Sequence, residues 1–470
     1  MDGISSSFDY RKGWSVNPAA KPGDIDAKAP FIENGTEKFD PAQYYDKGWM
    51  AQEWERLWTK AWLIACPSSD VREEGDFATF EIGNENIIIV RGDDGQVRAF
   101  YNVCPHRGNR LVHSALGSLS NGFACSFHSW KFNLDGSLKA ITDRETFRPE
   151  VVCHNPGLSA VRCEELAGLV FISMNPDAPD LRSWLGPVAD HLESYSIDKM
   201  HVVRQVRSEW AANWKVGVDA FYEVYHLHAV HPETQGVMED YFVQYDLFPH
   251  GMSRMCIPFY RPSPRVPDQL GVNDGLKMMM PDAALDPSCF TGTAQEVRAA
   301  AQRAKRERAE RLGLGYEKLT DAQLTDSFAY GLFPNVQIGC HPEGVFLMRF
   351  IPHPHDPERF FYDITILFRP VGAVAEAAGN YDVPAWMGLP EGTDISGRVR
   401  PDCVHVPLGE PANLGLVLDQ DSELLPVVQK GLRSRGFNGM LFGEQEQRLR
   451  HFHVELNRYM AGTLQSEGAR

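Results

Sequence analysis

Residues 104–136 read CPHRGNRLVHSALGSLSNGFACSFHSWKFNLDG, and two short Cys/His pairs stand out in this stretch. Cys104 and His106 form the first pair, and Cys125 and His128 form the second. Each pair supplies one thiolate and one imidazole from a short loop. Two thiolates on one iron and two neutral imidazoles on the other hold one kind of [2Fe–2S] cluster. The stretch therefore predicts an iron–sulfur domain built around these four side chains.

A structural zinc site is the alternative interpretation of the same residues, because Cys and His also bind zinc in pairs. Zinc sites more often group Cys with Cys and His with His, and the surrounding sequence is not that of a zinc finger. The mixed pairs favour the Rieske type of cluster, in which imidazoles raise the reduction potential and suit electron transfer toward oxygen. We expect Trp130, close to the second pair, to pack over the cluster as an apolar shield.

Length and charge limit the classes of protein that remain. The chain has 470 residues, enough for two or three domains at a prior of about 150 residues each. Its net charge is −17 without a block of basic residues, which disfavours nucleic acid and anionic membranes as partners. An acidic surface instead favours the approach of a partner with a basic docking patch.

The cysteines and the apolar segments predict a cytoplasmic protein. Nine cysteines without regular spacing do not resemble a disulfide framework and are most simply thiols in a reducing compartment. The first residues show no basic patch followed by an apolar run, so we expect no signal peptide. No apolar stretch approaches the length needed to span a membrane.

Strand-like and helix-like segments alternate in blocks, which predicts an α+β fold. Short strands are expected at 77–82, 86–91, 169–173, 345–351 and 360–368. Helices are expected at 41–61, 187–196 and 213–231. Residues 415–460 are expected to form two more helices, separated by a break at 436–439. We predict three parts. Residues 1–45 form an arm and first helix associated with a catalytic domain, residues 46–180 form the β-rich Rieske domain, and residues 181–470 form the catalytic domain.

A second metal site is predicted downstream. His226 and His231 lie five positions apart, which suits a helix whose last turn loosens before Pro232, since the residue before a proline avoids the α region. Two imidazoles and one carboxylate form the facial triad of mononuclear non-haem iron(II). The HxxxxH spacing is a weak signal alone. Beside a Rieske motif it becomes informative, because oxygen chemistry needs a supply of single electrons.

These motifs resemble those of the large (α) subunit of the Rieske non-haem iron oxygenases, the ring-hydroxylating oxygenase family, over nearly the whole chain. CPHRG and CSFHSWKFNLDG resemble the family's cluster signature, and NWKVGVDAFYEVYHLHAVHP resembles its iron-binding signature. The resemblance implies a catalytic domain of the helix-grip type, an antiparallel sheet wrapped around a substrate cavity. It also implies a homotrimer or an α3β3 assembly.

The resemblance assigns roles to two acidic residues near the iron histidines. Glu223 matches the acidic residue that bridges to the Rieske histidine of a neighbouring subunit and orients histidine ligands of both metals. Many ring dihydroxylases carry Asp there, so Glu223 weakens the inference that the product is a cis-diol. Asp219, one turn earlier, is a weaker catalytic candidate that can equally be a packing carboxylate. Ala220 replaces an Asn that is common beside the iron.

The third iron ligand is expected near the C-terminus, in the segment DQDSELLPVVQKG that begins at Asp419. The register resembles family members in which the ligand lies eight residues before a Gln, here Gln429, and this register selects Asp421. A helix N-cap is the alternative role for Asp421, since Asp is favoured at that position. Asp419 is the other candidate ligand.

The resemblance implies an O2-dependent oxidoreductase, of the kind classed under EC 1.14. No GxGxxG follows a strand, so NAD(P)H is expected to be oxidised by a separate reductase, directly or through a ferredoxin. Our main expectation is hydroxylation of a small aromatic or bulky apolar substrate, as in aromatic hydrocarbon catabolism, with a pocket wall drawn from the Phe- and Met-rich segment 242–280. A monooxygenase that removes N- or O-methyl groups is the alternative, so mono- and dioxygenation both stay open. A Rieske electron carrier without catalytic iron is the alternative from another class.

Overall fold

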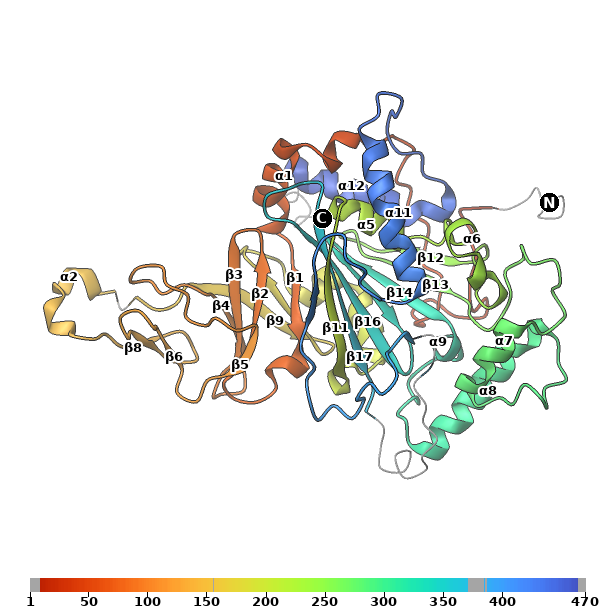
Figure 1. The fold of residues 1–470 in the computed structure, drawn as a ribbon, viewed down its shortest axis with the longest axis horizontal. Coiled ribbons are helices and arrows are strands. Elements are labelled where there is room, and N and C mark those ends of the chain that lie inside the picture. Colours follow the sequence, from red (N-terminus) through yellow and green to blue (C-terminus); the bar gives the residue numbers. More distant parts are fainter. Residues whose placement is uncertain (1–8, 155, 371–383, 385–386, 464–470) are drawn as a thin grey trace. The chain divides into compact units, whose positions relative to one another are not determined.

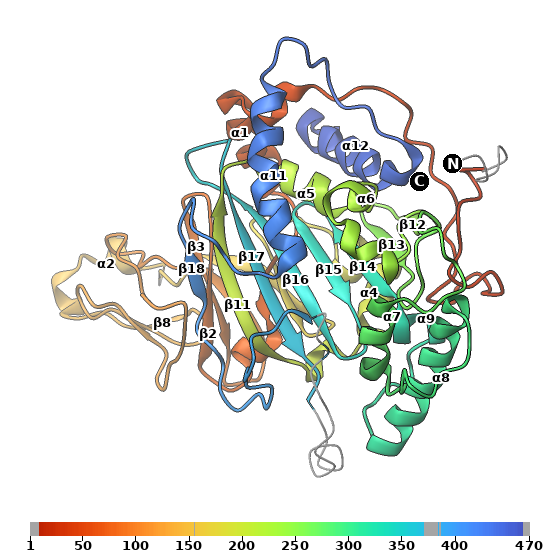
Figure 2. The same cartoon turned by 45° about the vertical axis from the view of Figure 1, so that its right-hand side comes forward.

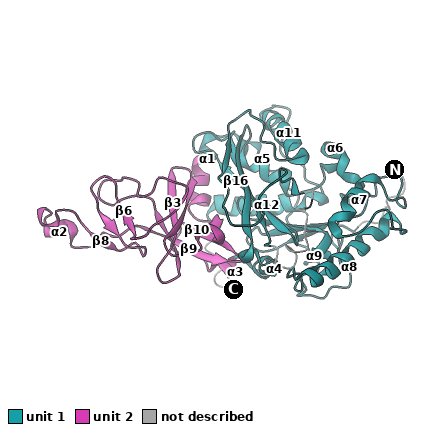
Figure 3. Cartoon of the chain, turned by 60° about the horizontal axis from the view of Figure 1, so that its bottom comes forward, with its two compact units in different colours: residues 1–50, 185–470 teal, residues 51–184 magenta. Residues whose placement is uncertain are grey.

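The structure is a computed structural model that describes residues 9–154, 156–370, 384 and 387–463. Two compact units divide the chain: residues 51–184 form one, and residues 1–50 with 185–470 form the other (Figure 3). The boundaries expected from the sequence, after residues 45 and 180, fall a few residues before those of the units. Mixed helices and antiparallel sheets confirm the α+β class.

The unit of residues 51–184 contains a seven-stranded sheet in the order β1-β10-β9-β4-β3-β2-β5 and a small sheet in the order β6-β7-β8. The strands are β1 (Leu63–Pro67), β2 (Asp76–Ile82), β3 (Glu85–Arg91), β4 (Val97–Tyr101), β5 (Leu116–Ser118), β6 (Phe123–Ala124), β7 (Lys131–Phe132), β8 (Leu138–Ala140), β9 (Ala160–Leu166) and β10 (Leu169–Ser173). Helix α2 (Pro149–Val152) and the short turns η3 (Ser68–Val71) and η4 (Arg144–Thr146) complete it. The predicted strands at 77–82, 86–91 and 169–173 are confirmed as β2, β3 and β10.

Asn102, just after β4, fixes the loop that carries the first Cys/His pair. Its side-chain oxygen accepts hydrogen bonds from the backbone N–H groups of Leu111 at 2.8 Å and Val112 at 3.1 Å. Its amide nitrogen donates to the carbonyl of Val112 at 2.8 Å. Because Asn102 is buried, these bonds are shielded from water and hold the loop against the apolar core.

The unit of residues 1–50 and 185–470 contains an eight-stranded sheet in the order β12-β13-β14-β15-β16-β17-β11-β18 (Figures 1 and 2). The strands are β11 (His201–Trp210), β12 (Gln244–Leu247), β13 (Ser253–Ile257), β14 (Ser327–Leu332), β15 (Val336–Cys340), β16 (Gly344–Pro352), β17 (Phe360–Phe368) and β18 (Val404–Val406). All neighbours are antiparallel except β11 and β18. The strands predicted at 345–351 and 360–368 are confirmed as β16 and β17.

The helices that surround this sheet are α4 (Pro187–Ser194), α5 (Trp214–Phe221), α6 (Leu227–Val230), α7 (Asp274–Met279), α8 (Ala294–Leu312), α9 (Asp321–Thr325), α11 (Leu416–Leu432) and α12 (Gln447–Ala461). Shorter turns are η1 (Pro41–Tyr44), η5 (Ile197–Lys199), η6 (Pro232–Gly236), η7 (Met280–Ala283) and η9 (Glu444–Glu446). Helices α1 (Lys47–Glu53) and α3 (Leu181–Leu185) reach across the unit boundaries, and η2 (Trp54–Trp58) follows α1. The single helix expected at 41–61 is therefore wrong in detail, because η1, α1 and η2 share that stretch.

Helices cover both faces of the eight-stranded sheet. On one face α5 packs against β15, β16 and β17, and α11 packs against α5. The close approach of α5 depends on Gly217, where a Cβ would lie only 2.7 Å from the ring of Phe350. On the opposite face His191 of α4 contacts the ring of Tyr330, with ring centroids 5.8 Å apart.

The N-terminal arm is fixed to the edge strand β12 and its neighbour β13. Asp246 accepts a hydrogen bond from the backbone N–H of Ala29 at 2.6 Å and pairs with the buried Arg254 at 2.7 Å. Arg254 also donates to the backbone carbonyl of Ala27 at 2.9 Å. A buried ion pair that also bonds the backbone of the arm keeps the arm attached to this unit. In the described part of the chain, no helix has both the length and the hydropathy to cross a membrane.

Candidate metal centres and cavity

The two Cys/His pairs lie on loops that follow β4 and β6. In the first, the N–H of Gly108 donates to the carbonyl of Cys104 at 3.0 Å. In the second, the N–H of Ser129 donates to the carbonyl of Cys125 at 2.9 Å. These bonds close a tight turn after each cysteine, and Ser129 adopts a positive φ of 58° to do so. Each turn thereby holds the cysteine and the histidine of its pair on one short loop.

The four predicted cluster ligands come together in the structure. Cys104 and Cys125 are buried, whereas His106 and His128 are partly exposed. The two imidazole rings have centroids 4.5 Å apart. Trp130 stacks on the His106 ring at 4.8 Å with an angle of 2° between the planes, as expected of an apolar shield.

Two local features fit an iron–sulfur cluster at this place. His106 Nδ1 is buried and has no hydrogen-bond partner among the described residues, as a ring nitrogen reserved for a metal would be. Burial opposes ionisation of the Cys125 thiol, but the backbone N–H groups of Phe127 and His128 lower its pKa overall. Asn109 Nδ2 lies 3.6 Å from the same sulfur. Donors directed at a sulfur favour the thiolate that binds metal.

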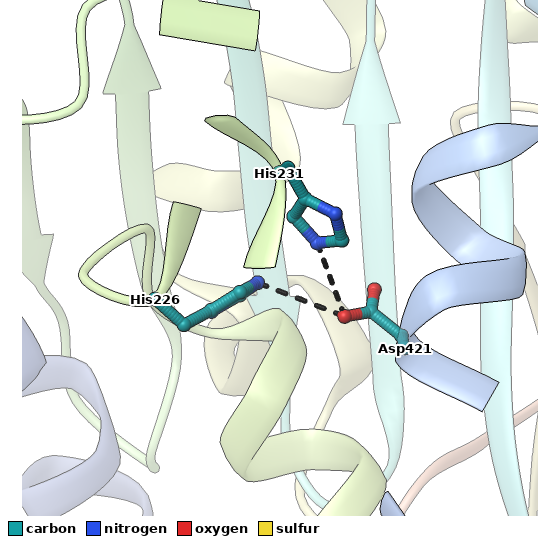
Figure 4. A group of neighbouring side chains, drawn as sticks. All are labelled: His226, His231 and Asp421. Carbon is teal, nitrogen blue, oxygen red and sulfur yellow. Dashed lines mark hydrogen bonds and ion pairs between the residues drawn. The ribbon is translucent and has the colours of Figure 1, made fainter. Parts of the chain in front are cut away.

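The second site gathers His226, His231 and Asp421, whose ligand atoms all lie within 4.8 Å of one another. Asp421 Oδ1 is 3.1 Å from His231 Nε2 and 3.7 Å from His226 Nε2. Figure 4 shows both imidazoles pointing toward that same carboxylate oxygen. His231 and Asp421 are buried and His226 is partly exposed. Two imidazoles and a carboxylate on one side of a shared point are the donor set of a non-haem iron(II) site.

The local structure around the histidines differs from the single helix expected at 213–231. Helix α5 ends at Phe221, and a separate single turn, α6, follows after a break. His226 is the N-cap of α6, and His231 is its C-cap with φ −124° and ψ 54°. The proline that follows His231 accounts for this non-helical conformation. One short turn between two non-helical residues thus lets histidines five apart face one point.

Asp421 reaches the site from the second turn of α11. The N-cap of this helix is Gly415, so the alternative role of Asp421 as an N-cap is wrong. Asp419 instead accepts a hydrogen bond from the backbone N–H of Leu414 at 3.0 Å, which stabilises the start of the helix. Asp419 is outside the group formed by the two histidines and Asp421.

Each histidine is oriented through its other ring nitrogen. Glu223 Oε1 lies 2.5 Å from His226 Nδ1, and Glu223 Oε2 accepts from the backbone N–H of His226 at 3.1 Å. Burial opposes protonation of His226, but the Glu223 carboxylate outweighs it and raises the pKa. Gln420 Oε1 lies 2.6 Å from His231 Nδ1. Acceptors on Nδ1 leave the Nε2 lone pairs free for metal.

Sequence reasoning missed Gln420, although it is adjacent to Asp421. Residue type gives no signal for this role, because a glutamine on a helix is most often solvent-exposed. Asp219, the weaker catalytic candidate, has different partners. Its carboxylate accepts from Tyr44 at 2.6 Å and lies 2.9 Å from His453 Nε2. Asp219 therefore connects η1, α5 and α12, and within the described part of the chain it forms no hydrogen bond or ion pair with His226, His231 or Asp421.

A cavity of about 450 Å³ opens onto His226, His231 and Asp421. Its walls are largely apolar, and its lining includes neither Lys nor Arg among the described residues. The expected pocket wall at 242–280 is correct only in part. Met255, Phe259 and Met279 line the cavity, whereas Phe248, Met252 and Met280 are buried outside it and Met278 is 77% exposed.

Comparison with known families matches both units. Residues 61–154 match the model of the Rieske [2Fe–2S] domain, and residues 197–462 match the model of the ring hydroxylating alpha subunit (catalytic domain). The match at 61–154 includes the four Cys and His residues and supports the iron–sulfur interpretation over zinc. The match at 197–462 includes both histidines of the second site and Asp421.

Curated relatives include enzymes with two kinds of substrate. The carnitine monooxygenase oxygenase subunit of Escherichia coli (strain K12) is 37% identical over 195 residues, 41% of this chain and 52% of the relative. The glycine betaine monooxygenase oxygenase subunit of Pseudomonas aeruginosa (strain PAO1) is 30% identical over 223 residues, 47% and 50% of the two chains. Biphenyl 2,3-dioxygenase subunit alpha of Rhodococcus jostii (strain RHA1) is 30% identical over 204 residues, which are 42% of this chain and 44% of the relative. The chain thus spans about half the length of the curated relatives it matches.

Solved structures match over a longer range. A quaternary ammonium Rieske monooxygenase in complex with L-carnitine aligns with a TM-score of 0.61 at 20% identity, covering 91% of this chain and 97% of that one. Naphthalene 1,2-dioxygenase with indole bound aligns with a TM-score of 0.62 at 18% identity, covering 93% of this chain and 95% of that one. At these identities the likeness establishes the fold.

Proposed function

The chain belongs to the family of ring hydroxylating alpha subunits with a Rieske [2Fe–2S] domain, and from this premise we propose that it is the terminal oxygenase of a multicomponent system. One Rieske cluster and one mononuclear iron are its cofactors. The observation that carries the proposal is the group of His226, His231 and Asp421 at the wall of an apolar cavity. A triad that leaves coordination positions open beside a cavity can bring dioxygen and an organic molecule together.

Specific residues would hold each cofactor. Cys104, Cys125, His106 and His128 would bind the cluster, which would supply single electrons, while iron in the second site would bind and activate dioxygen. Glu223 keeps His226 in the tautomer that offers Nε2 to the metal. Apolar walls exclude water from the reacting carbon, which limits unproductive reduction of oxygen.

We also propose partners for this activity. Electrons would come from an NAD(P)H-dependent reductase, directly or through a ferredoxin. Glu223 would serve as the bridge to a cluster histidine in a second copy of the chain, in a homotrimer or an α3β3 assembly. A side chain that already contacts His226 and retains unused lone pairs is suited to this second hydrogen bond.

For the reaction, we favour monooxygenation at a methyl group on nitrogen or oxygen over the aromatic hydroxylation that was our main expectation. Two of the three curated relatives described above are monooxygenase subunits named for carnitine and glycine betaine. Phe221, Phe259 and Phe346 line the cavity, and aromatic faces suit a methylated ammonium group. Hydroxylation of the methyl carbon would give an unstable product that releases formaldehyde. The apolar walls and the biphenyl dioxygenase relative keep ring hydroxylation as the second candidate.

Metal analysis and product analysis test these proposals separately. Anaerobically purified protein should contain about three iron per two acid-labile sulfides, the sum of one cluster and one mononuclear iron. About two iron per two sulfides after iron reconstitution would contradict the oxygenase and leave an electron carrier. With a reductase and N-methyl or O-methyl compounds, oxygen uptake should be matched by formaldehyde. A cis-diol from an aromatic compound without formaldehyde would favour the second candidate.

A further inference from the structure

The floor of the cavity is one face of the central strands, and its residues follow the alternation of a β-sheet. Met255, Ala329, Gly339 and Phe346 form one continuous row across β13, β14, β15 and β16, since each is paired with the next. All four line the cavity. Tyr330, the residue after Ala329 on β14, points to the opposite face, where it contacts His191 of α4. The row therefore projects into the cavity as a unit.

The middle of this row is hollow because its two central residues are small. At Gly339 a Cβ would meet only the side chain of Phe346, at 3.7 Å, which is ordinary van der Waals contact. A larger residue at Gly339 would therefore extend into the cavity without displacing backbone. Ala329 and Gly339 thus make room for the body of a bound molecule between the larger side chains of Met255 and Phe346.

The neighbouring row is polar. Ser327 is paired with Ile257, and the pair Phe328–Cys340 places Ser327 opposite His341 in the next antiparallel position. Ser327 and His341 both line the cavity. Ser327 Oγ has no hydrogen-bond partner in the described part of the chain. His341 lies between aromatic rings, with centroids 5.8 Å from Phe259 and 6.1 Å from Phe346.

The surroundings of this polar row do not favour an anion. Burial, with Lys305 nearby, lowers the pKa of His341 to about 3, so its imidazole is neutral at pH 7. Lys305 Nζ is itself 2.7 Å from Glu343 Oε1, so its charge is balanced. A carboxylate placed here would lose its hydration without gaining a cationic partner.

We propose that Ser327 and His341 form a hydrogen-bonding subsite for an uncharged oxygen group, a hydroxyl or carbonyl, of a substrate whose apolar body lies over Ala329 and Gly339. The inference deepens the proposed function and rests on it, because the cavity is taken as the substrate cavity of the oxygenase. A hydroxyl that opens onto the cavity without a protein partner gains a hydrogen bond from such a ligand and none from an apolar one. At this position the subsite thus favours an uncharged oxygen group over both a hydrocarbon group and a carboxylate.

Three probes of one size test the subsite: naphthalene, 2-naphthol and 2-naphthoate. Their affinities for the iron-loaded holoenzyme are measured by probe fluorescence without oxygen, so that no turnover occurs. The wild-type protein should bind 2-naphthol about threefold to tenfold more tightly than naphthalene, the range of one net hydrogen bond. It should bind 2-naphthoate more weakly than 2-naphthol.

Matched variants locate the effect. Ser327→Ala should remove most of the preference for 2-naphthol and leave naphthalene binding unchanged, and His341→Phe should do the same. Gly339→Val should weaken both probes equally, because it fills the floor of the cavity. A preference that survives Ser327→Ala and His341→Phe, unchanged affinities in Gly339→Val, or tight binding of 2-naphthoate would each overturn the proposal.

Oxygen uptake separates this inference from the proposed function. If the preference depends on Ser327 and His341 but no methyl or aromatic compound supports oxygen uptake with a reductase, the subsite stands and the oxygenase proposal fails. If oxygen uptake occurs and the variants bind the probes as the wild type does, the oxygenase proposal stands and the subsite is wrong.

Discussion

The imidazole of His231 lies between two consecutive residues of α11. Gln420 contacts its Nδ1 at 2.6 Å, and Asp421 contacts its Nε2 at 3.1 Å. Neighbouring side chains on a helix diverge, so they can reach two edges of one flat ring. His226 has a charged partner, Glu223, on the corresponding nitrogen, whereas His231 has a neutral amide. The two proposed iron ligands therefore differ in the charge of the side chain that contacts Nδ1.

Gln420→Leu should weaken metal binding without disturbing the cluster. Loss of the acceptor leaves the tautomer of His231 unspecified and removes the contact that fixes its ring. Partners of this kind are worth about 10- to 100-fold in metal affinity. Titration of the iron-depleted protein with Co(II), followed by its visible absorption, measures the change, and Gln420→Glu serves as the control that keeps an acceptor. An unchanged Co(II) affinity in Gln420→Leu would show that the contact is incidental.

Asp421→Asn and Asp419→Asn form a matched pair for the third ligand. Asp421→Asn should lower the iron content from about three to about two per two sulfides, because an amide is a far weaker ligand for Fe(II) than a carboxylate. Asp419→Asn should retain the full iron content, since this side chain caps the start of α11 through Leu414. Iron and sulfide analysis decides the pair. Loss of iron in Asp419→Asn alone would reverse the assignment.

For single residues, the sequence allows a site residue to be predicted when its residue type and spacing are themselves typical of the role. Cys104, His106, Cys125 and His128 could be recognised because thiolates and imidazoles at short spacing have few other uses, and the structure brings them together. Gln420 could not be recognised, because its role comes from a contact with a residue far away in the chain. Asp421 could be selected only through its register within a known family pattern.

Among the elements, α5 shows how one residue sets the distance between a helix and a sheet. Gly217 faces Phe350 and Phe360, and a Cβ there would lie 2.7 and 2.9 Å from their rings. Glu223 and His226 follow α5 directly, so a shift of the helix would move both. The position of the proposed iron site therefore depends on residue 217 having no side chain.

Gly217→Ala should destabilise the protein, although alanine is the better helix former. The added methyl group meets aromatic rings in a packed layer, and overpacking of this kind costs about 1–3 kcal/mol. Gly431→Ala, in the exposed last turn of α11, is the control, because nothing lies within 4 Å of its Cβ position. It should stabilise the protein by about 0.4–1 kcal/mol. Urea unfolding followed by circular dichroism gives both values, and destabilisation of equal size in the two variants would contradict this account.

Periodicity predicted element types well and contacts between elements poorly. The strands β2, β3, β10, β16 and β17 were predicted from alternation and β-branched residues. Helix α8 has the charged composition of a solvated surface helix, but not all of its charged residues are exposed. Lys305 in this helix is buried and pairs with Glu343 at 2.7 Å. A lysine gives no sign in sequence of such a partner, because the pairing joins α8 to Glu343, a residue far along the chain that precedes β16.

For the whole molecule, two buried histidines make stability depend on pH. Burial, helped by the nearby Arg254, lowers the pKa of His191 to about 3. Burial does the same for His341, with Lys305 contributing. In the unfolded chain a histidine titrates near 6.5. Between pH 6.5 and about 3 the unfolded state therefore binds protons that the folded state does not.

Well above pH 6.5 these two histidines should therefore contribute no pH dependence to the free energy of unfolding. Below pH 6.5 they should make the free energy of unfolding fall as the pH falls. Each group contributes a slope of about 1.4 kcal/mol per pH unit once its unfolded form is protonated. His191→Leu removes one group, so between pH 6 and pH 5 the variant should lose about 1 kcal/mol less than the wild type. Gly431→Ala, at an exposed position, changes no titratable group and should lose as much as the wild type. The iron-binding groups are common to all three proteins, so their own pH dependence cancels in the difference. Urea unfolding at several pH values measures the slopes, and identical slopes in wild type and His191→Leu would show that His191 is protonated in the folded protein.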